Sequence, residues 1–345
     1  MIPHSRPHVS DDDAEAVARV VRGGQLAQGP EVLAFEREVA QRVGVPAAAA
    51  VSSGTAALEL ALRALDVGPG ADVVVPSYTC DALHHAVTRC GARPVLADAD
   101  PATRTMSAID AKRRLSARTR ALIVPHAFGL AIDLGPFEGL GVPIVEDCAQ
   151  ALGARVGARA AGAQGRLAVC SFYATKLVAA GEGGMVLGPA DLVARARDAR
   201  DYDEREDLLP RSNAKLTDMQ AALGRSQLRR LDAFIARRRA IAAEYRRRLA
   251  PLPCRPPADA GDAHVYHRFV VEVDRDVPSV LEALQDRGVT ARRPVFRPLH
   301  RALGLPGYTE SERLWRTCVS VPCYPALTDA EVETVAAALV DVLGR

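Results

Sequence analysis

The sequence has 345 residues, of which 48% are hydrophobic and 25% are charged, and its formal net charge is +2. This length predicts about two domains with a large buried core, and the composition is that of an ordinary soluble globular protein. The near-neutral charge argues against a nucleic-acid or acidic-membrane partner, no apolar stretch is long enough to span a bilayer, and residues 1–6 lack the apolar run of a secretory signal. We therefore expect a cytoplasmic protein that binds neither nucleic acid nor membrane.

From about residue 45 to 190, short apolar runs alternate with segments of helical periodicity. The runs at 73–75, 94–97, 121–124 and 143–145 are expected to be buried strands, and 56–65 and 81–89 are expected to be helices. Strand and helix alternation with continuously apolar strands predicts an α/β fold whose mostly parallel sheet is covered on both faces. Ligand sites of such sheets lie at the carboxyl ends of the strands.

The remainder of the chain predicts a long helix followed by a small α+β domain. Apolar residues recur at helical spacing over 216–250, and the opposite face is rich in arginine, which we interpret as a solvated face and not as a nucleic-acid surface. A strand is expected at 267–273, and helices are expected at 280–287 and 329–343, the last with Thr328 as N-cap. We place the large domain at 1–235 and the connecting helix with the C-terminal domain at 236–345.

The cysteines and histidines predict no metal site. The seven cysteines are scattered without a CxxC pair, so neither a disulfide framework nor a zinc site is expected. His264 and His267 lack an accompanying acidic or thiolate cluster, and we expect them to be partly buried polar residues.

Ser53-Gly54-Thr55 directly precedes an alanine- and leucine-rich helical segment. A helix N-terminus offers unpaired N–H groups and partial positive charge, which together hold a phosphate well. Glycine lets the backbone approach closely, and the hydroxyls add donors. The same three residues would also make a good helix cap with no ligand.

Two further motifs contribute a carboxylate and an amine. Asp147 follows a predicted strand and could face a pyridine nitrogen, although by itself it could equally cap a helix; Gln150 could reach the ring hydroxyl. Lys176 lies between apolar and glycine-rich segments in a chain with only two other lysines, so we expect amine chemistry from it. A phosphate cradle, a carboxylate and an amine are what pyridoxal phosphate (PLP) requires from a protein.

Several other motifs accompany these three along nearly the whole chain. They are IPHSRP at 2–7, QGP at 28–30, VSSGTAAL at 51–58, VPSYT at 75–79, the segments 145–153, 171–184 and 213–222, HVYH at 264–267, SVP at 320–322 and LTD at 327–329. In this combination the chain resembles the sugar aminotransferases of the DegT/StrS type, which are PLP enzymes of fold type I. The resemblance implies transfer of an amino group from glutamate or glutamine to a keto group of a nucleotide-linked sugar, of the kind used for polysaccharide or antibiotic sugars.

The resemblance also implies roles for individual residues. Lys176 matches the Schiff-base lysine, Asp147 the partner of the ring nitrogen and Gln150 the contact of the ring hydroxyl. The matches to phosphate ligands are Gly54, Thr55 and Ser171. Asn213 matches an asparagine that reaches the phosphate bound in the neighbouring subunit, which implies a homodimer with shared active sites.

The chain departs from the family pattern at two positions. Cys80 occupies the place where a flat residue usually stacks on the cofactor ring, and a thiol can pack there but cannot stack. Lys215 replaces a commoner arginine, which matters if that side chain makes a bidentate contact. Both departures bear on the substrate and the cofactor contacts more than on the reaction type.

The sequence bears differently on three alternatives to this function. A branch of the family that removes a sugar hydroxyl carries histidine in place of lysine, and Lys176 argues against it. An aminotransferase for a cyclitol ketone or another non-nucleotide carbonyl is left open by the motifs. A non-catalytic PLP-binding regulatory protein would lack the lysine or carry a DNA-binding domain, and neither is seen in the sequence. The residues expected at the substrate entrance are Arg292, Arg293, His300 and Tyr324.

Overall fold

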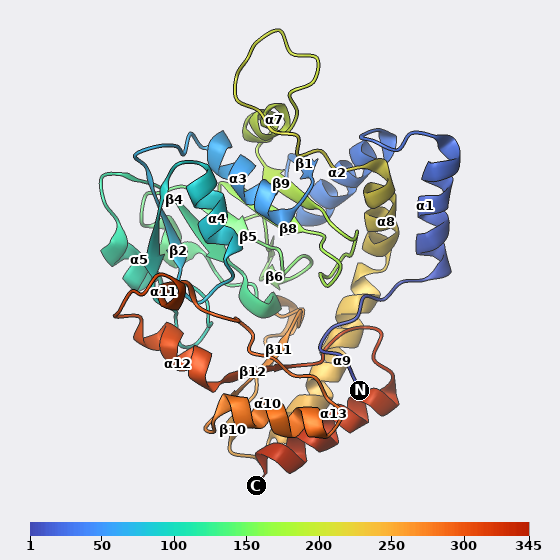
Figure 1. Ribbon diagram of the computed structural model, residues 1–345, viewed down its shortest axis with the longest axis vertical. Coiled ribbons are helices and arrows are strands. Elements are labelled where there is room, and N and C mark those ends of the chain that lie inside the picture. Colours follow the sequence, from blue (N-terminus) through green and yellow to red (C-terminus); the bar gives the residue numbers. More distant parts are fainter. Residues whose placement is uncertain (345) are drawn as a thin grey trace.

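The computed structural model describes residues 1–344, and a seven-stranded sheet forms the centre of its larger part (Figure 1). The strand order is β1-β9-β8-β5-β4-β2-β3. Their bounds are β1 (Ala47–Val51), β2 (Asp72–Pro76), β3 (Arg93–Ala97), β4 (Thr119–Pro125), β5 (Ile144–Asp147), β8 (Leu167–Ser171) and β9 (Gly184–Gly188). β9 runs antiparallel to both of its neighbours, and the other strands share one direction. The prediction of a mostly parallel sheet is confirmed.

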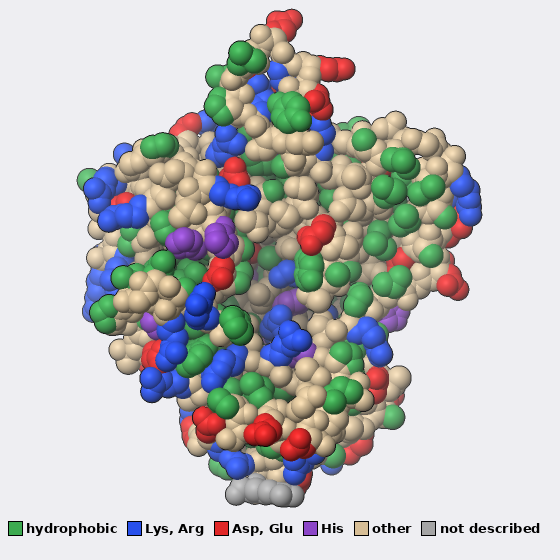
Figure 2. Space-filling view, viewed as in Figure 1, with side chains coloured by type: hydrophobic (Ala, Val, Ile, Leu, Met, Phe, Trp, Pro, Cys, Tyr) green, Lys and Arg blue, Asp and Glu red, His purple; other side chains and the backbone are tan. Residues whose placement is uncertain are grey.

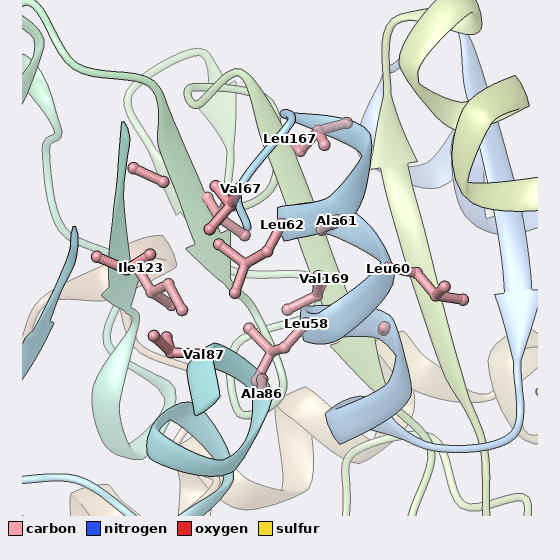
Figure 3. Packing of buried hydrophobic residues seen from close by; sticks show 14 of the residues in the cluster. Leu58, Leu60, Ala61, Leu62, Val67, Ala86, Val87, Ile123, Leu167 and Val169 are labelled. Carbon is pink, nitrogen blue, oxygen red and sulfur yellow. The ribbon is translucent and has the colours of Figure 1, made fainter. Parts of the chain in front are cut away.

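Helices cover both faces of this sheet, as the apolar strands predicted. The bounds are α2 (Pro30–Val43), α3 (Gly54–Ala64), α4 (Ala82–Arg89), α5 (Ala108–Arg114), α6 (Gly135–Glu138) and α7 (Ala190–Ala199). In Figure 3, Leu58 and Leu62 of α3 lie over the sheet residues Ile123 and Val169, with Val87 of α4 beside them. The opposite face packs against α2 and against the beginning of α9. Alternate residues of each strand therefore enter different cores.

A smaller antiparallel sheet, in the order β10-β11-β12, forms the second part of the molecule. Its elements are β10 (Cys254–Arg255), β11 (Phe269–Val273), α10 (Val277–Asp286), α11 (Leu299–Ala302), α12 (Thr309–Thr317), β12 (Cys318–Val321) and α13 (Asp329–Leu343). Thr328 caps α13, and its hydroxyl accepts a hydrogen bond from the Glu331 N–H while the Glu331 carboxylate accepts one from the Thr328 N–H. The expected N-cap and the expected α+β character of this part are confirmed.

The expected helix over 216–250 consists of two helices. α8 (Asp218–Arg229) begins at the capping box of Thr217 and Gln220, and α9 (Leu231–Leu249) follows after a break at Arg230. Neither glycine nor proline marks this break. It occurs where Arg230 pairs with the buried Asp13 of α1 (Asp11–Gly23), a partner that helical spacing does not predict.

The arginine-rich face of α9 is also not uniformly solvated. Arg238 is 4% exposed and donates hydrogen bonds to the carbonyl groups of Tyr266, His267 and Cys323. Arg247, in contrast, is exposed and pairs with Glu244. The interpretation as a solvated face is therefore wrong for Arg238, which joins α9 to the segment before β11.

Helix α9 belongs to both parts of the molecule. Its first turns contribute Leu231 and Ile235 to the core beneath the large sheet, and its later turns contribute Ile241 and Tyr245 to the core of the small sheet. A division at residue 235 would thus fall within a continuous helix, and the two-domain boundary stays a prediction. No helix within residues 1–344 is long and apolar enough to cross a membrane.

The first residues of the chain connect the two parts. Ile2 forms a bridge with Val289, and the segment then passes His4, which bonds to Ser320, before His8 packs against Phe234 of α9. Pro3, His4 and Ser5 therefore form one wall of the groove described below.

Short elements complete the fold around the site. They are the 3-10 turns at Ala127–Gly129 and Gly261–Ala263 and the hairpin of β6 (Arg155–Val156) with β7 (Arg159–Ala160).

Candidate active site

The N-terminus of α3 meets the end of β8. Ser53 is the N-cap, and its Oγ accepts a hydrogen bond of 3.1 Å from the Ala56 N–H, so this hydroxyl caps the helix. A Cβ at Gly54 would lie 2.8 Å from the Cβ of Ser171, so only glycine fits without a shift. The first-turn N–H groups of α3 and the hydroxyls of Thr55 and Ser171 thus come from adjoining segments, and this junction is the candidate phosphate recess.

Asp147 ends β5 and lines a cavity at the carboxyl edge of the sheet. Its Oδ1 accepts a hydrogen bond of 3.0 Å from the Ala149 N–H, and Oδ2 has no hydrogen-bond partner within residues 1–344. Burial raises the pKa of this carboxyl group, so a cation placed at Oδ2 would favour the ionised form. A protonated ring nitrogen meets this requirement.

Gln150 lines the same cavity. Its Oε1 accepts a hydrogen bond of 2.7 Å from the Phe128 N–H, which fixes the orientation of the amide. The Nε2 donor has no protein partner in the described chain and can therefore serve the hydroxyl of a bound ring.

Lys176 lies in the loop between β8 and β9 and reaches the cavity. Its backbone N–H donates to the Tyr173 carbonyl over 2.8 Å, and Nζ makes no hydrogen bond to residues 1–344. Burial lowers the pKa of Lys176, and the positive charge of Arg268 lowers it further, whereas Cys80 and Asp147 act in the opposite direction. A lysine with a lowered pKa is a better nucleophile and proton acceptor at neutral pH.

Lys176 lines an inner cavity that adjoins an outer groove. The inner cavity has a volume of about 190 Å³ and is lined, besides Lys176, by Asp147, Gln150, Cys80, Tyr78 and Phe128. It shares Pro294, Phe296 and Arg297 with an outer groove of about 1120 Å³. In Figure 2, Lys and Arg side chains gather around a hollow between the two parts of the molecule.

Behind Asp147 a buried hydrogen-bond network holds β4 and β5 in place. His126 and Glu146 are joined at 2.8 Å, and the other ring nitrogen of His126 accepts the Ile132 N–H. Glu146 also accepts the backbone N–H groups of Gly162, Gln164 and Gly165, which together with His126 hold its pKa below the usual range despite burial. The Cys148 thiol lies within 4.8 Å of this pair. Because these lone pairs already accept protein hydrogen bonds, the cluster is a structural network.

The structure brings Lys176, Asp147, Gln150 and Cys80 to one cavity, whereas Asn213 lies elsewhere. Cys80 lines the inner cavity and is exposed to it. The protein packed around the cavity still raises the pKa of the Cys80 thiol by burial. Asn213 is exposed on the loop after α7 and lines neither hollow. Lys215 bonds to Asp201 at 2.7 Å and also to Asp203, so carboxylates of its own chain already occupy it.

The structure places the four residues expected at the substrate entrance in different surroundings. Arg292 and Arg293 line the outer groove. His300 instead is buried against Ser77, with a hydrogen bond of 2.7 Å, and Tyr324 is 1% exposed in the core of the small domain. Those two residues lie outside the groove because the His300 ring bonds to Ser77 and the Tyr324 ring packs in the core of the small domain.

Sequence reasoning missed Phe128 and Arg268, which lie beside the reacting groups. Phe128 adopts a left-handed backbone conformation, with φ of 60°, that is uncommon for a bulky residue and often marks a functional site. Arg268 lies directly after the HVYH motif and before an apolar strand, and an arginine entering a buried strand is the signal that could have indicated it.

Comparison with known proteins gives the family. A model of the DegT/DnrJ/EryC1/StrS aminotransferase family matches residues 7–340. The chain belongs to this family. A curated relative, GDP-perosamine synthase of Caulobacter vibrioides, is 33% identical, with 91% of each chain covered.

Solved structures of similar proteins agree with this family assignment. The aminotransferase TlmJ of Streptoalloteichus hindustanus matches with a TM-score of 0.94 and 34% identity over 100% of this chain and 99% of its own. DesV of S. venezuelae, solved in complex with a ketimine intermediate, matches with a TM-score of 0.92 and 35% identity over 97% of this chain and 95% of its own. The fold is therefore that of the fold type I sugar aminotransferases, and the family is PLP-dependent.

Proposed function

We propose that this sugar aminotransferase moves an amino group from glutamate or glutamine to a keto group of a nucleotide-linked sugar, with Lys176 as its reactive amine. The observation that supports this most is the convergence of Lys176, of Asp147 with its free Oδ2 and of Gln150 with its free Nε2 on one cavity. These groups match PLP, which offers an aldehyde, a ring nitrogen, a ring hydroxyl and a phosphate.

Each protein group has a distinct task in this proposal. PLP supplies an aldehyde that reacts with amines and a ring that accepts the electron pair left when a proton leaves the adjacent carbon. Lys176 binds the aldehyde, and its uncharged Nζ removes and returns the proton at the reacting carbon of the substrate. Asp147 keeps the ring nitrogen positively charged, and Gln150 orients the ring through its hydroxyl.

The outer groove supports an anionic acceptor. Arg292, Arg293 and Arg297 line it, and none of them forms an ion pair with a carboxylate of the described chain. A diphosphate between a sugar and a nucleoside would satisfy these guanidinium groups. A neutral cyclitol ketone would leave them without a partner, so the groove favours the nucleotide-linked acceptor.

The position of Asn213 supports a homodimer. The loop that precedes it extends from the body of the molecule after α7 (Figure 1). Its Leu208 is 101% exposed and its Leu209 is 64% exposed, which is unusual for leucine in a monomer. We infer that this loop packs on a second copy and places Asn213 at the phosphate recess there.

The direct test is spectroscopic. We expect the protein purified with PLP to show the visible absorption band of lysine-linked cofactor, and L-glutamate or L-glutamine to replace it with the near-ultraviolet band of pyridoxamine phosphate. Borohydride reduction should attach the cofactor covalently to residue 176. Lys176→Ala should lose the covalent adduct, whereas Lys112→Ala, at an exposed lysine, should retain it.

Two results would contradict the proposal. If PLP binds but neither glutamate nor glutamine changes the band, the assigned donor is wrong. If reduction labels the Lys176→Ala variant as well as the wild type, residue 176 is not the reactive amine.

A further inference from the structure

Arg268 is placed at the junction of the inner cavity and the outer groove. Its backbone N–H donates to the Phe128 carbonyl over 3.1 Å, which ties the start of β11 to the loop that lines the cavity. Its guanidinium lines the outer groove and is close enough to Lys176 to lower the pKa of that amine. Thr175, the residue before Lys176, lines the same groove, so Arg268 faces the end of the groove at which Lys176 lies.

The charge of Arg268 has no carboxylate partner within residues 1–344. Its Nη1 lies 3.1 Å from both ring nitrogens of His4, and His4 in turn contacts the Ser320 hydroxyl at 2.9 Å. Burial first, and then Arg268 and Arg292, lower the pKa of His4 to about 3, so this imidazole is neutral at physiological pH. Burial and the neighbouring Arg292 also lower the pKa of Arg268.

A desolvated guanidinium without a counter-ion is costly unless an anion binds to it. This chain satisfies most of its arginines internally. Arg301, on the same groove wall, bonds to Glu312 at 2.6 Å, and Arg313 bonds to Glu310 at 2.8 Å. Arg268 thus differs from Arg301 and Arg313 because it forms no ion pair, and it differs from the exposed Arg292 because it is half-buried.

The geometry of the two substrates decides which anion suits this position. The α-carboxylate of an amino acid is attached to the same carbon as its reacting nitrogen. The diphosphate of a nucleotide-linked sugar, in contrast, is separated from the keto carbon by part of the sugar ring. An arginine beside Lys176 is therefore within reach of the carboxylate, and the arginines farther along the groove are within reach of the diphosphate.

We propose that Arg268, held in place by the neutral imidazole of His4, binds the α-carboxylate of the amino donor, while the outer arginines bind the acceptor. This assignment rests on the proposed function, because it presupposes that an amino acid is the donor. It separates the site into a carboxylate pocket next to Lys176 and a phosphate groove beyond it, so that donor and acceptor alternate at one lysine with different anion contacts.

Titration calorimetry of the PLP-loaded protein with two unreactive probes tests the assignment. Glutarate reports on the carboxylate pocket, and inorganic pyrophosphate reports on the phosphate groove. Arg268→Gln should weaken glutarate binding at least about tenfold, because a charge-assisted hydrogen bond is lost, and should leave pyrophosphate binding within about twofold. Arg268→Lys should give an intermediate loss, since the charge remains without the planar fork.

Arg301→Gln is the matched control. It also removes a positive charge from the groove wall, but that charge is already paired with Glu312, so glutarate binding should change little. In rapid-mixing experiments, Arg268→Gln should raise the apparent dissociation constant for L-glutamate more than it lowers the limiting rate of the band change.

The alternatives give different results. If Arg268→Gln weakens pyrophosphate and not glutarate, Arg268 belongs to the acceptor groove and the assignment is wrong. If folded Arg268→Gln and Arg268→Lys bind both probes like the wild type, Arg268 is only structural. If the wild type binds glutarate through Arg268 but no amino acid changes the band, the proposed function fails while the anion site stands.

Discussion

Burial acts in opposite directions on the pKa values of the two ionisable groups at the centre of the site. It lowers the pKa of Lys176 and raises that of Asp147, so in both cases it disfavours the charged form. The amine gains reactivity from this directly. The carboxyl group becomes a partner that ionises when a cation stands beside it, which makes it selective for a protonated ring.

A buried histidine near the site gives a pH prediction at the same scale. Burial lowers the pKa of His264 from 6.5 to about 3, and its Nδ1 accepts the Tyr266 N–H over 3.0 Å. Between these two values the unfolded state binds more protons than the folded state, so the free energy of unfolding falls as pH falls through this window. His264→Asn keeps an acceptor for the residue two positions on but does not titrate.

We therefore expect the free energy of unfolding of His264→Asn to decline less than that of the wild type between pH 6.5 and pH 3, measured by urea unfolding at several pH values. His85→Asn, at an exposed histidine, should follow the wild-type profile. Parallel profiles for His264→Asn and the wild type would show that His264 is protonated in the folded state.

Individual residues of the site differ in how far the sequence could reveal them. Lys176, Asp147 and Gln150 stand in local motifs whose chemistry is distinctive, and the structure brings all three to one cavity. Arg268 has no such motif, because its proximity to Lys176 depends on how the small domain meets the loop of Phe128. Contacts between segments far apart in the chain are not encoded in spacing.

Among the elements, α9 connects the catalytic cavity to the core of the small domain. Burial lowers the pKa of Arg238 to about 10, and this side chain bonds to three carbonyl groups, those of Tyr266 and His267 among them. These carbonyls belong to the segment that leads into Arg268. Arg238 therefore fixes the approach of β11 to the site.

Arg238→Met should lower the free energy of unfolding by about 2–4 kcal/mol, because buried carbonyl groups lose their donor. Arg247→Met, on the exposed face of the same helix, should leave the free energy of unfolding nearly unchanged, because an exposed ion pair contributes little. Chemical denaturation of both variants measures the difference. Equal losses for the two variants would mean that the bonds of Arg238 contribute no net stability.

The elements that sequence patterns located best are those with strong periodicity. The apolar strands β2 to β5 and the capped helix α13 lie where they were expected, because burial of one face dominates their sequences. The alanine-rich β1 and the antiparallel β9 were not predicted, because neither contains a run of β-branched residues like that of β2. The break at Arg230 was also not predicted, because Asp13, the partner of Arg230 at this point, is far away in the sequence.

At the scale of the whole molecule, the proposed phosphate recess would take one residue from a second copy of the chain. Gly54, Thr55 and Ser171 lie at the junction of α3 and β8, whereas Asn213 stands on the projecting loop away from both hollows of its own chain. If the recess takes its asparagine from the partner, two different defects in two subunits can be combined so that one site is whole. A site built within one chain cannot be repaired in this way.

We expect Lys176→Ala and Asn213→Ala homodimers each to lose the glutamate-driven band change at limiting PLP. In a heterodimer of the two, the intact Lys176 and the intact Asn213 meet in one site, and the other site carries both defects. Heterodimers isolated with two different tags should therefore recover about half of the wild-type amplitude, as one of two symmetric sites. No recovery would place Asn213 in the site of its own chain, and would leave the exposed Leu208 and Leu209 of the loop to be explained by another partner.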